Sequence, residues 1–306
     1  MARSRYRRPS ALVVLGAMAL DELVGDPANR WHPVRWLGVG IAALEDRIYA
    51  DSRTRGAVFW GLLLVPSVVL PPLLRPGGRI FEVLGVWSTL GGRSLVREAE
   101  VIAALLDKGD IPGARARLGH LVGRDTDDLG AAEIARAAIE SLAENTTDAV
   151  LGPLWWYVAG GLSGALAFRS SNTLDAMVGH LNRRYYNFGY FSAKVDDLAV
   201  TPAAVVGVIA SWVLAPAEGR RRIGELITLA PQHPSLNAGL IEAAFAGALG
   251  VDLGGVNRYR GRAVTTPRLL GGSSPDVRAL HQASRFSRRV ARVGALAAML
   301  AIVVGR

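Results

Sequence analysis

The chain has 306 residues, of which half are hydrophobic and 20% are charged. Its net charge is +9, and nearly all of its basic residues are arginine. Soluble domains carry about 25% charged residues, so this composition favours a membrane protein and excludes a disordered one, because so apolar a chain must bury or insert its surface. The absence of cysteine excludes disulfide scaffolds, zinc–thiolate sites, iron–sulfur clusters and cysteine nucleophiles.

The N-terminal segment predicts a membrane-associated helix. Residues 1–8 are basic and residues 11–20 are apolar, as in a secretory signal peptide. However, Asp21 and Glu22 follow directly, and no cleavage site of small residues comes after them. A crossing needs about 20 residues, so we expect a retained first helix that does not span the bilayer alone. The basic start favours a cytoplasmic N-terminus.

Several charge-free stretches predict membrane crossings. Residues 56–74, 149–167 and 198–217 each have about the length of a bilayer crossing. Residues 294–305 form a shorter candidate, and residues 80–90 a doubtful one that Glu82 interrupts. The alternative is a large soluble α protein with buried helices, in which several runs of this kind would be unusual.

Polar helices are expected between the apolar stretches. Residues 94–106 have helical spacing, a second helix starts at Pro112 and runs to about Leu121, and a third, capped by Asp128, covers residues 131–145. No alternating stretch bounded by hairpin turns is evident. We therefore predict an all-α fold: a multi-pass integral membrane helical bundle, as a single domain over residues 1–306, with a polar helical insertion at about 93–148.

Four polar clusters are candidates for chemistry. Carboxylates beside the first helix could bind Mg²⁺, although helix capping and solvation explain an isolated segment better. Glu140, Glu144 and Asp148 recur at a spacing that places them on one helix face, next to an apolar stretch, which favours a metal or substrate site. The third cluster, between two predicted crossings, suits an anionic ligand, and the fourth lies among glycines that allow close approach of helices or of a ligand. In chain order the four clusters are Asp21, Glu22, Asp26, His32, Arg35 and Glu45; Glu140, Glu144, Asn145 and Asp148; Arg169, Asn172, Asp175, Arg183, Lys194, Asp196 and Asp197; and Ser235, Asn237, Glu242 and Asn257.

Common catalytic motifs are absent from the sequence. It has no P-loop, no dinucleotide-binding glycine motif, no H-E-x-x-H and no G-x-S-x-G. The five histidines are scattered, which argues against a zinc site with several histidines. The basic residues are scattered too, so we expect no nucleic-acid partner.

The motifs taken together resemble a known family. They are Asp21-(x)3-Gly25-Asp26-Pro27, His32-Pro33-Val34, Gly123-Arg124-Asp125-Thr126, Glu140-Ser141-(x)2-Glu144-Asn145-(x)2-Asp148, Asn172-Thr173-Leu174-Asp175, Phe188-Gly189, Asp196-Asp197, Asn237-Ala238-Gly239-(x)2-Glu242 and Leu249-Gly250-Val251. Their order resembles the CobD/CbiB family of cobalamin biosynthesis, the adenosylcobinamide-phosphate synthases, from about Asp21 to about Gly261.

The resemblance implies an integral enzyme of the cell (plasma or inner) membrane with its active site facing the cytoplasm. It implies a ligase that joins (R)-1-amino-2-propanol, free or as its O-phosphate, to the free propionate of adenosylcobyric acid, which gives adenosylcobinamide or its phosphate. ATP as co-substrate and Mg²⁺ are expected, because a carboxylate must be activated before it forms an amide. A homo-oligomer or an association with other corrin-pathway enzymes stays open.

Residue chemistry suggests the roles within such a site. Acids and a histidine can move protons, arginine, lysine and amides can hold phosphates, and aspartates can bind Mg²⁺. We expect His32, Asn145, Asn172 and Asp196 to converge in one pocket. The catalytic candidates are His32, Glu144, Asp148 and Asp175; the substrate-binding candidates are Arg35, Arg124, Asn145, Arg169, Asn172, Arg183, Lys194, Asn237 and Glu242; and the metal candidates are Asp21, Asp26, Asp196 and Asp197.

Two alternatives belong to other classes of protein. The first is a non-catalytic sensor like the related AmpE-type proteins, for which this dense set of acids and amides is not expected. The second is a membrane transporter, because acids at the ends of spans can mark ion paths, although no inverted repeat is visible.

Overall fold

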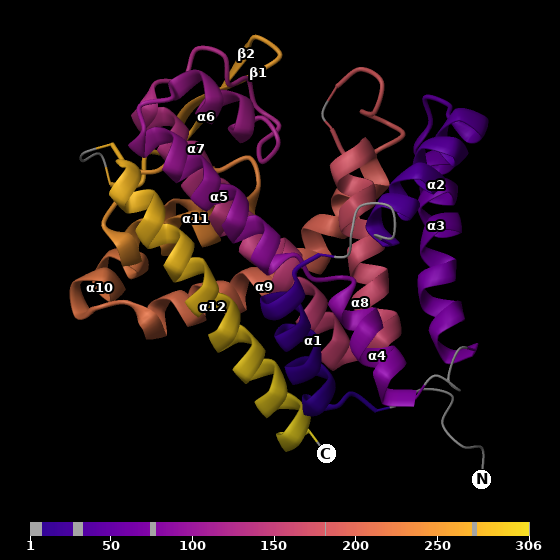
Figure 1. The fold of residues 1–306 in the computed structure, drawn as a ribbon. Helices are drawn as coiled ribbons and strands as arrows, with labels where there is room; N and C mark the ends of the chain where they lie inside the picture. Colours follow the sequence, from indigo (N-terminus) through magenta and orange to yellow (C-terminus); the bar gives the residue numbers. More distant parts are fainter. Residues whose placement is uncertain (1–7, 27–32, 74–77, 181, 271–273, 306) are drawn as a thin grey trace. The chain divides into compact units, whose positions relative to one another are not determined.

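A computed structural model of the chain describes residues 8–26, 33–73, 78–180, 182–270 and 274–305. Most of the described residues are helical (Figure 1). The elements are α1 (Ala11–Val24), α2 (Pro33–Ile48), α3 (Arg53–Leu73), α4 (Gly78–Trp87), α5 (Gly92–Asp107), α6 (Ile111–Leu118), α7 (Ala131–Thr146), a π-helical segment (Thr147–Leu151), α8 (Gly152–Val178), α9 (Tyr190–Leu214), α10 (Ala217–Leu226), a 3-10 helix (Ile227–Gln232), α11 (Leu236–Leu249), β1 (Gly255–Tyr259), β2 (Arg262–Thr266) and α12 (Val277–Val304).

The chain divides into two compact units. The first unit comprises Met1–Gly91, Asp148–Ala203 and Ala295–Arg306, and the second comprises Gly92–Thr147 and Ala204–Gly294. Both α9 and α12 contribute residues to both units, as does the helical run from α7 through α8. The single domain expected from the sequence remains a prediction.

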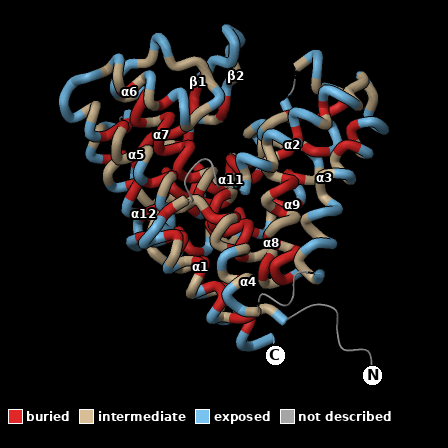
Figure 2. The backbone as a smooth tube through the Cα atoms, turned by 45° about the vertical axis from the view of Figure 1, so that its right-hand side comes forward, coloured by how far each residue is buried: buried red, intermediate tan, exposed pale blue. Residues whose placement is uncertain are grey.

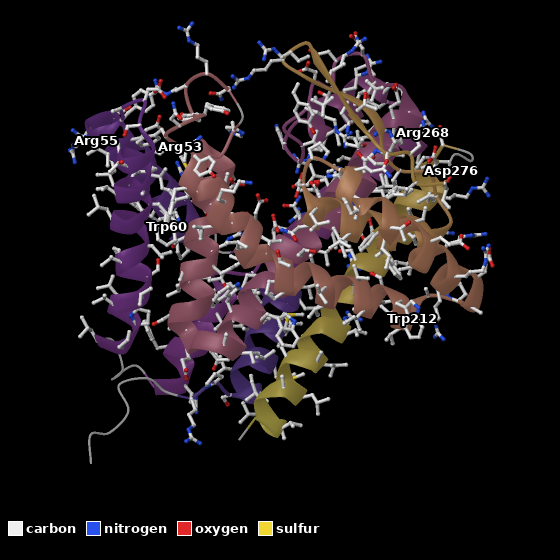
Figure 3. All side chains as sticks on the ribbon, turned by 180° about the vertical axis from the view of Figure 1, so that it is seen from behind. Arg53, Arg55, Trp60, Trp212, Arg268 and Asp276 are labelled. Atoms are coloured by element: carbon white, nitrogen blue, oxygen red, sulfur yellow. The ribbon has the colours of Figure 1, made fainter. Side chains whose placement is uncertain are left out.

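In the first unit, α2 and α3 pack on α8. Trp60 of α3 (Figure 3) donates a hydrogen bond from Nε1 to Ser171 Oγ of α8 at 3.1 Å. These contacts hold the C-terminal part of α8, which carries Asn172 and Asp175, against α3. The buried residues of this core are Ile41, Phe59, Leu174, Val178 and Phe188.

The apolar stretch 149–167 is not one straight helix. Within α8, Gly161 has φ 62° and ψ −153°, which is not helical. A Cβ built on Gly164 would collide with the carbonyl of Trp156, and one built on Gly152 would collide with the ring of Phe168. Residues that far apart along a straight helix are separated by about 12 and 24 Å. The chain therefore folds back on itself at Gly161, and residues 152–160 and 162–178 form two arms of a helical hairpin.

The second unit confirms the predicted polar helices. α5 covers the expected helix at residues 94–106, and α7 covers the one at residues 131–145. The helix that starts with Pro112 in its first turn is α6, and Asp110 caps it by accepting a hydrogen bond from Gly113 N at 2.9 Å. Asp128 was predicted as the cap of α7, but the N-cap is Gly130, whose N–H donates to Glu133 Oε2 at 2.8 Å.

A β-hairpin in the second unit corrects the expectation that no such element exists. β1 and β2 pair in antiparallel fashion, and the turn between them consists of Arg260 (φ 51°) and Gly261 (φ 77°). Two positive φ angles match the twist of a hairpin. Asp125 holds this turn, because its carboxylate accepts from Arg260 N at 2.9 Å and from Gly261 N at 2.7 Å. The supporting residue is distant in sequence, so the local pattern alone did not reveal the turn.

Three helical segments are long and apolar enough to cross a membrane, by length and composition: Arg53–Leu73, Ala131–Val178 and Tyr190–Leu214. They cover residues 56–73, 149–167 and 198–214 of the three expected stretches. Residues 294–305 are the end of α12, whose first half carries several arginines, and residues 80–90 overlap α4, which is only 10 residues long. Figure 2 shows α3 mainly as exposed and intermediate, and its only buried residues are Gly56 and Phe59.

Candidate functional site

An amide links two aspartates in the first unit. Asn172 of α8 donates from Nδ2 to Asp148 Oδ2 at 3.2 Å and to Asp196 Oδ2 at 3.4 Å. Asp148 lies in the π-helical segment before the hairpin and Asp196 in the first turns of α9. Asp196 is buried, and among the described residues its Oδ1 has no hydrogen-bond partner. π-Helical turns are frequent at functional sites.

Further charges surround this amide. Arg169 is within electrostatic range of Asp148 and Asp26, and Asp175 is within range of Asp148 and Asp197. The Nε of Arg169 is buried without a hydrogen-bond partner in the described part of the chain. Carboxylates this close repel one another unless a cation or a proton joins them. We name this set the Asn172 cluster: Asp148, Arg169, Asn172, Asp175 and Asp196.

The Asn172 cluster can be tested for its fit to Mg²⁺. The described residues contain no group of three or more His, Asp or Glu side chains placed to hold a metal ion by themselves. Mg²⁺ in phosphate-transferring enzymes usually binds one or two carboxylates, together with substrate phosphates and water. Asp148 and Asp196, with the unpartnered Oδ1 of Asp196, suit that mode. Of the other predicted ligands, Asp21 is buried in α1, whereas Asp197 is half exposed and pairs with Lys194 at 3.5 Å.

A second polar network joins distant segments of the second unit. The carboxylate of Glu140 accepts hydrogen bonds from Arg124, from Arg136 at 2.9 Å and from Gly254 N at 2.8 Å. Both arginines also donate to the side-chain oxygen of Asn257. The guanidinium of Arg124, predicted to bind substrate, is therefore buried and engaged with protein groups. This network ties the loop before α7 to α7 and β1.

Two predicted site residues form a carboxyl pair in the same unit. The side chains of Glu144 and Glu242 are hydrogen-bonded to each other, and burial raises the pKa of Glu242 well above its usual range, an effect that the charges of Glu140 and Glu144 reinforce. Because two ionised carboxylates cannot share a hydrogen bond, Glu242 holds the proton.

His233 lies beside this pair and was not singled out by the sequence analysis. Its Nε2 is 3.9 Å from Glu242 Oε2, and its Nδ1 lies 2.7 Å from the carbonyl oxygen of Ser235. Burial lowers the pKa of His233 and favours the neutral ring. Its place just before the Ser235 N-cap of α11, which carries Asn237 and Glu242, was the signal that could have identified it.

The three carboxylates expected on one helix face have different partners. Glu140 binds arginines, Glu144 pairs with Glu242, and Asp148 binds Asn172. The π-helical segment begins at Thr147, so the α-helical spacing assumed for Asp148 does not continue through it.

The remaining predicted residues are placed as follows. Asn172 and Asp196 converge as expected, whereas Asn145 belongs to the second unit, where its Nδ2 donates to Ser141 O at 2.9 Å. His32 lies outside the described residues. Asn237 is buried in α11, and Arg35, Arg183 and Lys194 are exposed.

Comparison with known proteins identifies the family. A family model described as CobD/Cbib protein matches residues 14–287. The chain is 40% identical over 312 aligned residues to "Cobalamin biosynthesis protein CobD" of Mycobacterium tuberculosis (strain CDC 1551 / Oshkosh), covering 99% of this chain and 98% of the relative. It is 40% identical to the protein of that name from Geobacter metallireducens (84% of this chain, 85% of the relative) and 39% identical to the one from Stutzerimonas stutzeri (89% and 91%). No solved structure matches the chain. The chain belongs to the CobD/Cbib protein family.

Proposed function

We propose that the chain acts in cobalamin biosynthesis as a membrane-bound ligase that joins aminopropanol O-phosphate to the free propionate of adenosylcobyric acid. The supporting observation is its membership of a family whose relatives, named cobalamin biosynthesis proteins, align over nearly the whole chain. The apolar helices α3 and α9, each long enough to cross a bilayer, are compatible with a membrane location. The polar substrates favour a site that opens to the cytoplasm.

The proposed reaction proceeds in two displacements. A propionate oxygen attacks the γ-phosphorus of ATP, ADP leaves, and an acyl phosphate forms. The amine nitrogen, after losing one proton to a base, attacks the acyl carbon, and phosphate leaves as the C–N bond forms. The nitrogen then loses a second proton, and one of the two protons released ends on the phosphate. The product is the amide of adenosylcobinamide phosphate.

The Asn172 cluster would supply the groups that this reaction needs. Asp148 and Asp196 would hold Mg²⁺ together with substrate phosphate, and the ion would supply charge neutralisation for phosphoryl transfer. Arg169 would bind phosphate oxygens. Asp175 is the candidate base for the ammonium proton. Asn172 would act as a positioning residue, because its single amide orients both aspartates.

A turnover assay tests this function. Protein in detergent is incubated with adenosylcobyric acid, aminopropanol phosphate, ATP and Mg²⁺, and the corrinoid is followed by mass spectrometry. We expect a mass gain of one amide-linked aminopropanol phosphate that disappears when ATP is omitted. Replacing Asn172 with alanine or Asp196 with asparagine should lower the rate about 100-fold or more, as for loss of a group that stabilises developing charge.

Asp46→Asn is the matched control, because it removes a carboxylate exposed on α2 of the same unit and should leave the rate unchanged. Wild-type turnover in both cluster variants would contradict the site assignment. Corrinoid binding without any turnover would instead favour the sensor, and corrinoid flux into liposomes would favour the transporter.

A further inference from the structure

Three contacts in the first unit pair residues on either side of Gly161. Asn172 Nδ2 donates to Asp148 Oδ2 at 3.2 Å. A Cβ on Gly152 would overlap the ring of Phe168, and a Cβ on Gly164 would overlap the carbonyl of Trp156. The residue numbers of each pair add to the same total, which is the signature of two antiparallel arms. In a straight helix the members of these three pairs would lie about 36, 24 and 12 Å apart, in the order given.

Glycine allows the reversal at the tip. Gly161 adopts φ 62°, a region that glycine enters without steric cost. Gly161 is buried, and just beyond it Ser163 Oγ donates to the carbonyl of Val68 in α3 at 3.0 Å. Irregular backbone at membrane depth is tolerated where protein covers it. The neighbouring Ala159 and Gly160 are exposed, and both are uncharged and small.

The first arm of the hairpin is too short to cross a bilayer. Residues 152–160 span about 13 Å and residues 162–172 about 16 Å, against a hydrocarbon core of about 30 Å. Residues 149–167 nevertheless carry no charge, so this part of the hairpin suits an apolar surrounding. The charged and amide side chains of the hairpin, Asp148, Arg169 and Asn172, lie within about one helical turn of its open end.

We propose that residues 148–172 form a re-entrant hairpin, which enters the apolar layer of the membrane and returns to the face from which it came. This inference rests on the membrane location in the proposed function but not on the reaction. It places Asp148 and Asn172 on one membrane face, although the charge-free stretch between them predicts a crossing. The Asn172 cluster then opens to a single face, and the lipid acyl layer is the partner of the hairpin tip.

The natural absence of cysteine makes a direct test of the fold-back simple. Gly152→Cys/Phe168→Cys and, as a second pair, Trp156→Cys/Gly164→Cys are oxidised in native membrane vesicles, and the tryptic peptides are analysed for thiols that resist alkylation. We expect disulfides in both pairs, formed about tenfold or more faster than in the control pair Ala193→Cys/Ile209→Cys, because cysteines whose Cα atoms are more than about 7 Å apart do not bridge. The control pair has the same spacing as the first pair along α9.

A single cysteine at the tip, Gly160→Cys, tests insertion. In sealed vesicles of either orientation we expect protection from a charged maleimide but reaction with a membrane-permeant one. Free, alkylatable thiols in both hairpin pairs would overturn the fold-back, and labelling of the tip by the charged reagent would overturn its insertion. If the tip cysteine is protected and both hairpin pairs form disulfides, but turnover fails, only the proposed reaction is contradicted and the hairpin stands.

Discussion

The carboxyl group of Glu242 is a buried acid that keeps its proton. It donates to Glu144, and burial together with the charges of Glu140 and Glu144 raises its pKa. A carboxyl with a raised pKa favours the folded state fully only below its unfolded pKa of about 4.3, and that contribution is lost as the pH rises through the folded value. Glu242 therefore keeps a proton that it gives up as the pH rises, and this ionisation lowers the stability of the folded state.

Replacing Glu242 by glutamine should separate the hydrogen bond from the charge. Glutamine keeps a donor toward Glu144 and cannot ionise, so the fall in stability as the pH rises from about 4.3, the unfolded pKa, to alkaline values should become shallower than in the wild type. Glu242→Ala leaves Glu144 without its donor and should cost about 1–3 kcal/mol. Thermal unfolding in detergent across this pH range measures both effects. Glu225→Gln, an exposed change on α10, is the control, and a pH profile for Glu242→Gln parallel to the wild type would refute the argument.

At the scale of elements, the sequence predicts what depends on local spacing. Helical periodicity located α5, a proline in the first turn located α6, and α7 covers the helix expected at residues 131–145, although its cap is Gly130 and not Asp128. The reversal at Gly161 escaped prediction because charge-free length carries no information about direction, and paired glycines serve close helix packing as well as a turn. The β-hairpin escaped because Asp125, far away in the chain, holds its turn.

The candidate site shows the same limit. Spacing along the chain grouped Glu140, Glu144 and Asp148, whereas their hydrogen-bond partners include Gly254 just before β1, Glu242 of α11 and Asn172 of α8. Asn172 and Asp196 were expected to share one pocket with His32 and Asn145, and the structure joins these two by a hydrogen bond. Which acids share a proton, and which are neutralised by arginine, depends on tertiary contacts that no local pattern encodes.

Two glycines of α3 provide a test of packing between elements. A Cβ on Gly56 would collide with the carbonyl of Phe188, whereas a Cβ on Gly61 meets nothing within 4 Å. Gly56→Ala should therefore destabilise by about 1–3 kcal/mol, as overpacking does. Gly61→Ala should be neutral or stabilise by up to about 1 kcal/mol, because alanine favours the helix. Unfolding midpoints in detergent that shift equally in both variants would contradict the close approach of α3 to residue 188.

At the scale of the molecule, apolar side chains remain uncovered along two long helices. α3 exposes Val58, Leu62, Val65 and Val69, and α9 exposes Leu198, Val205 and Ile209. In the most apolar window of α3 only 17% of the residues are buried, and in that of α9 only 33%. Apolar surfaces this extended are rare on soluble monomers, and a lipid environment would cover them. Trp212, near the end of α9 (Figure 3), is also exposed and suits the interfacial position that tryptophan favours.

Arginine placed in the middle of α3 tests whether this surface faces lipid. Val65 and Val256 are both 56% exposed, but Val65 lies in α3 and Val256 in the β-hairpin of the second unit. Val65→Arg should cost about 2.5–3.5 kcal/mol if α3 crosses the bilayer, because a charge at mid-depth must be solvated there. Val256→Arg keeps its charge outside the candidate spans and should be neutral. Recovery in the membrane pellet after an alkaline wash should therefore fall for Val65→Arg and stay at the wild-type level for Val256→Arg. Equal, full recovery of both would mean that α3 does not insert, and the apolar face would then need a protein partner in place of lipid.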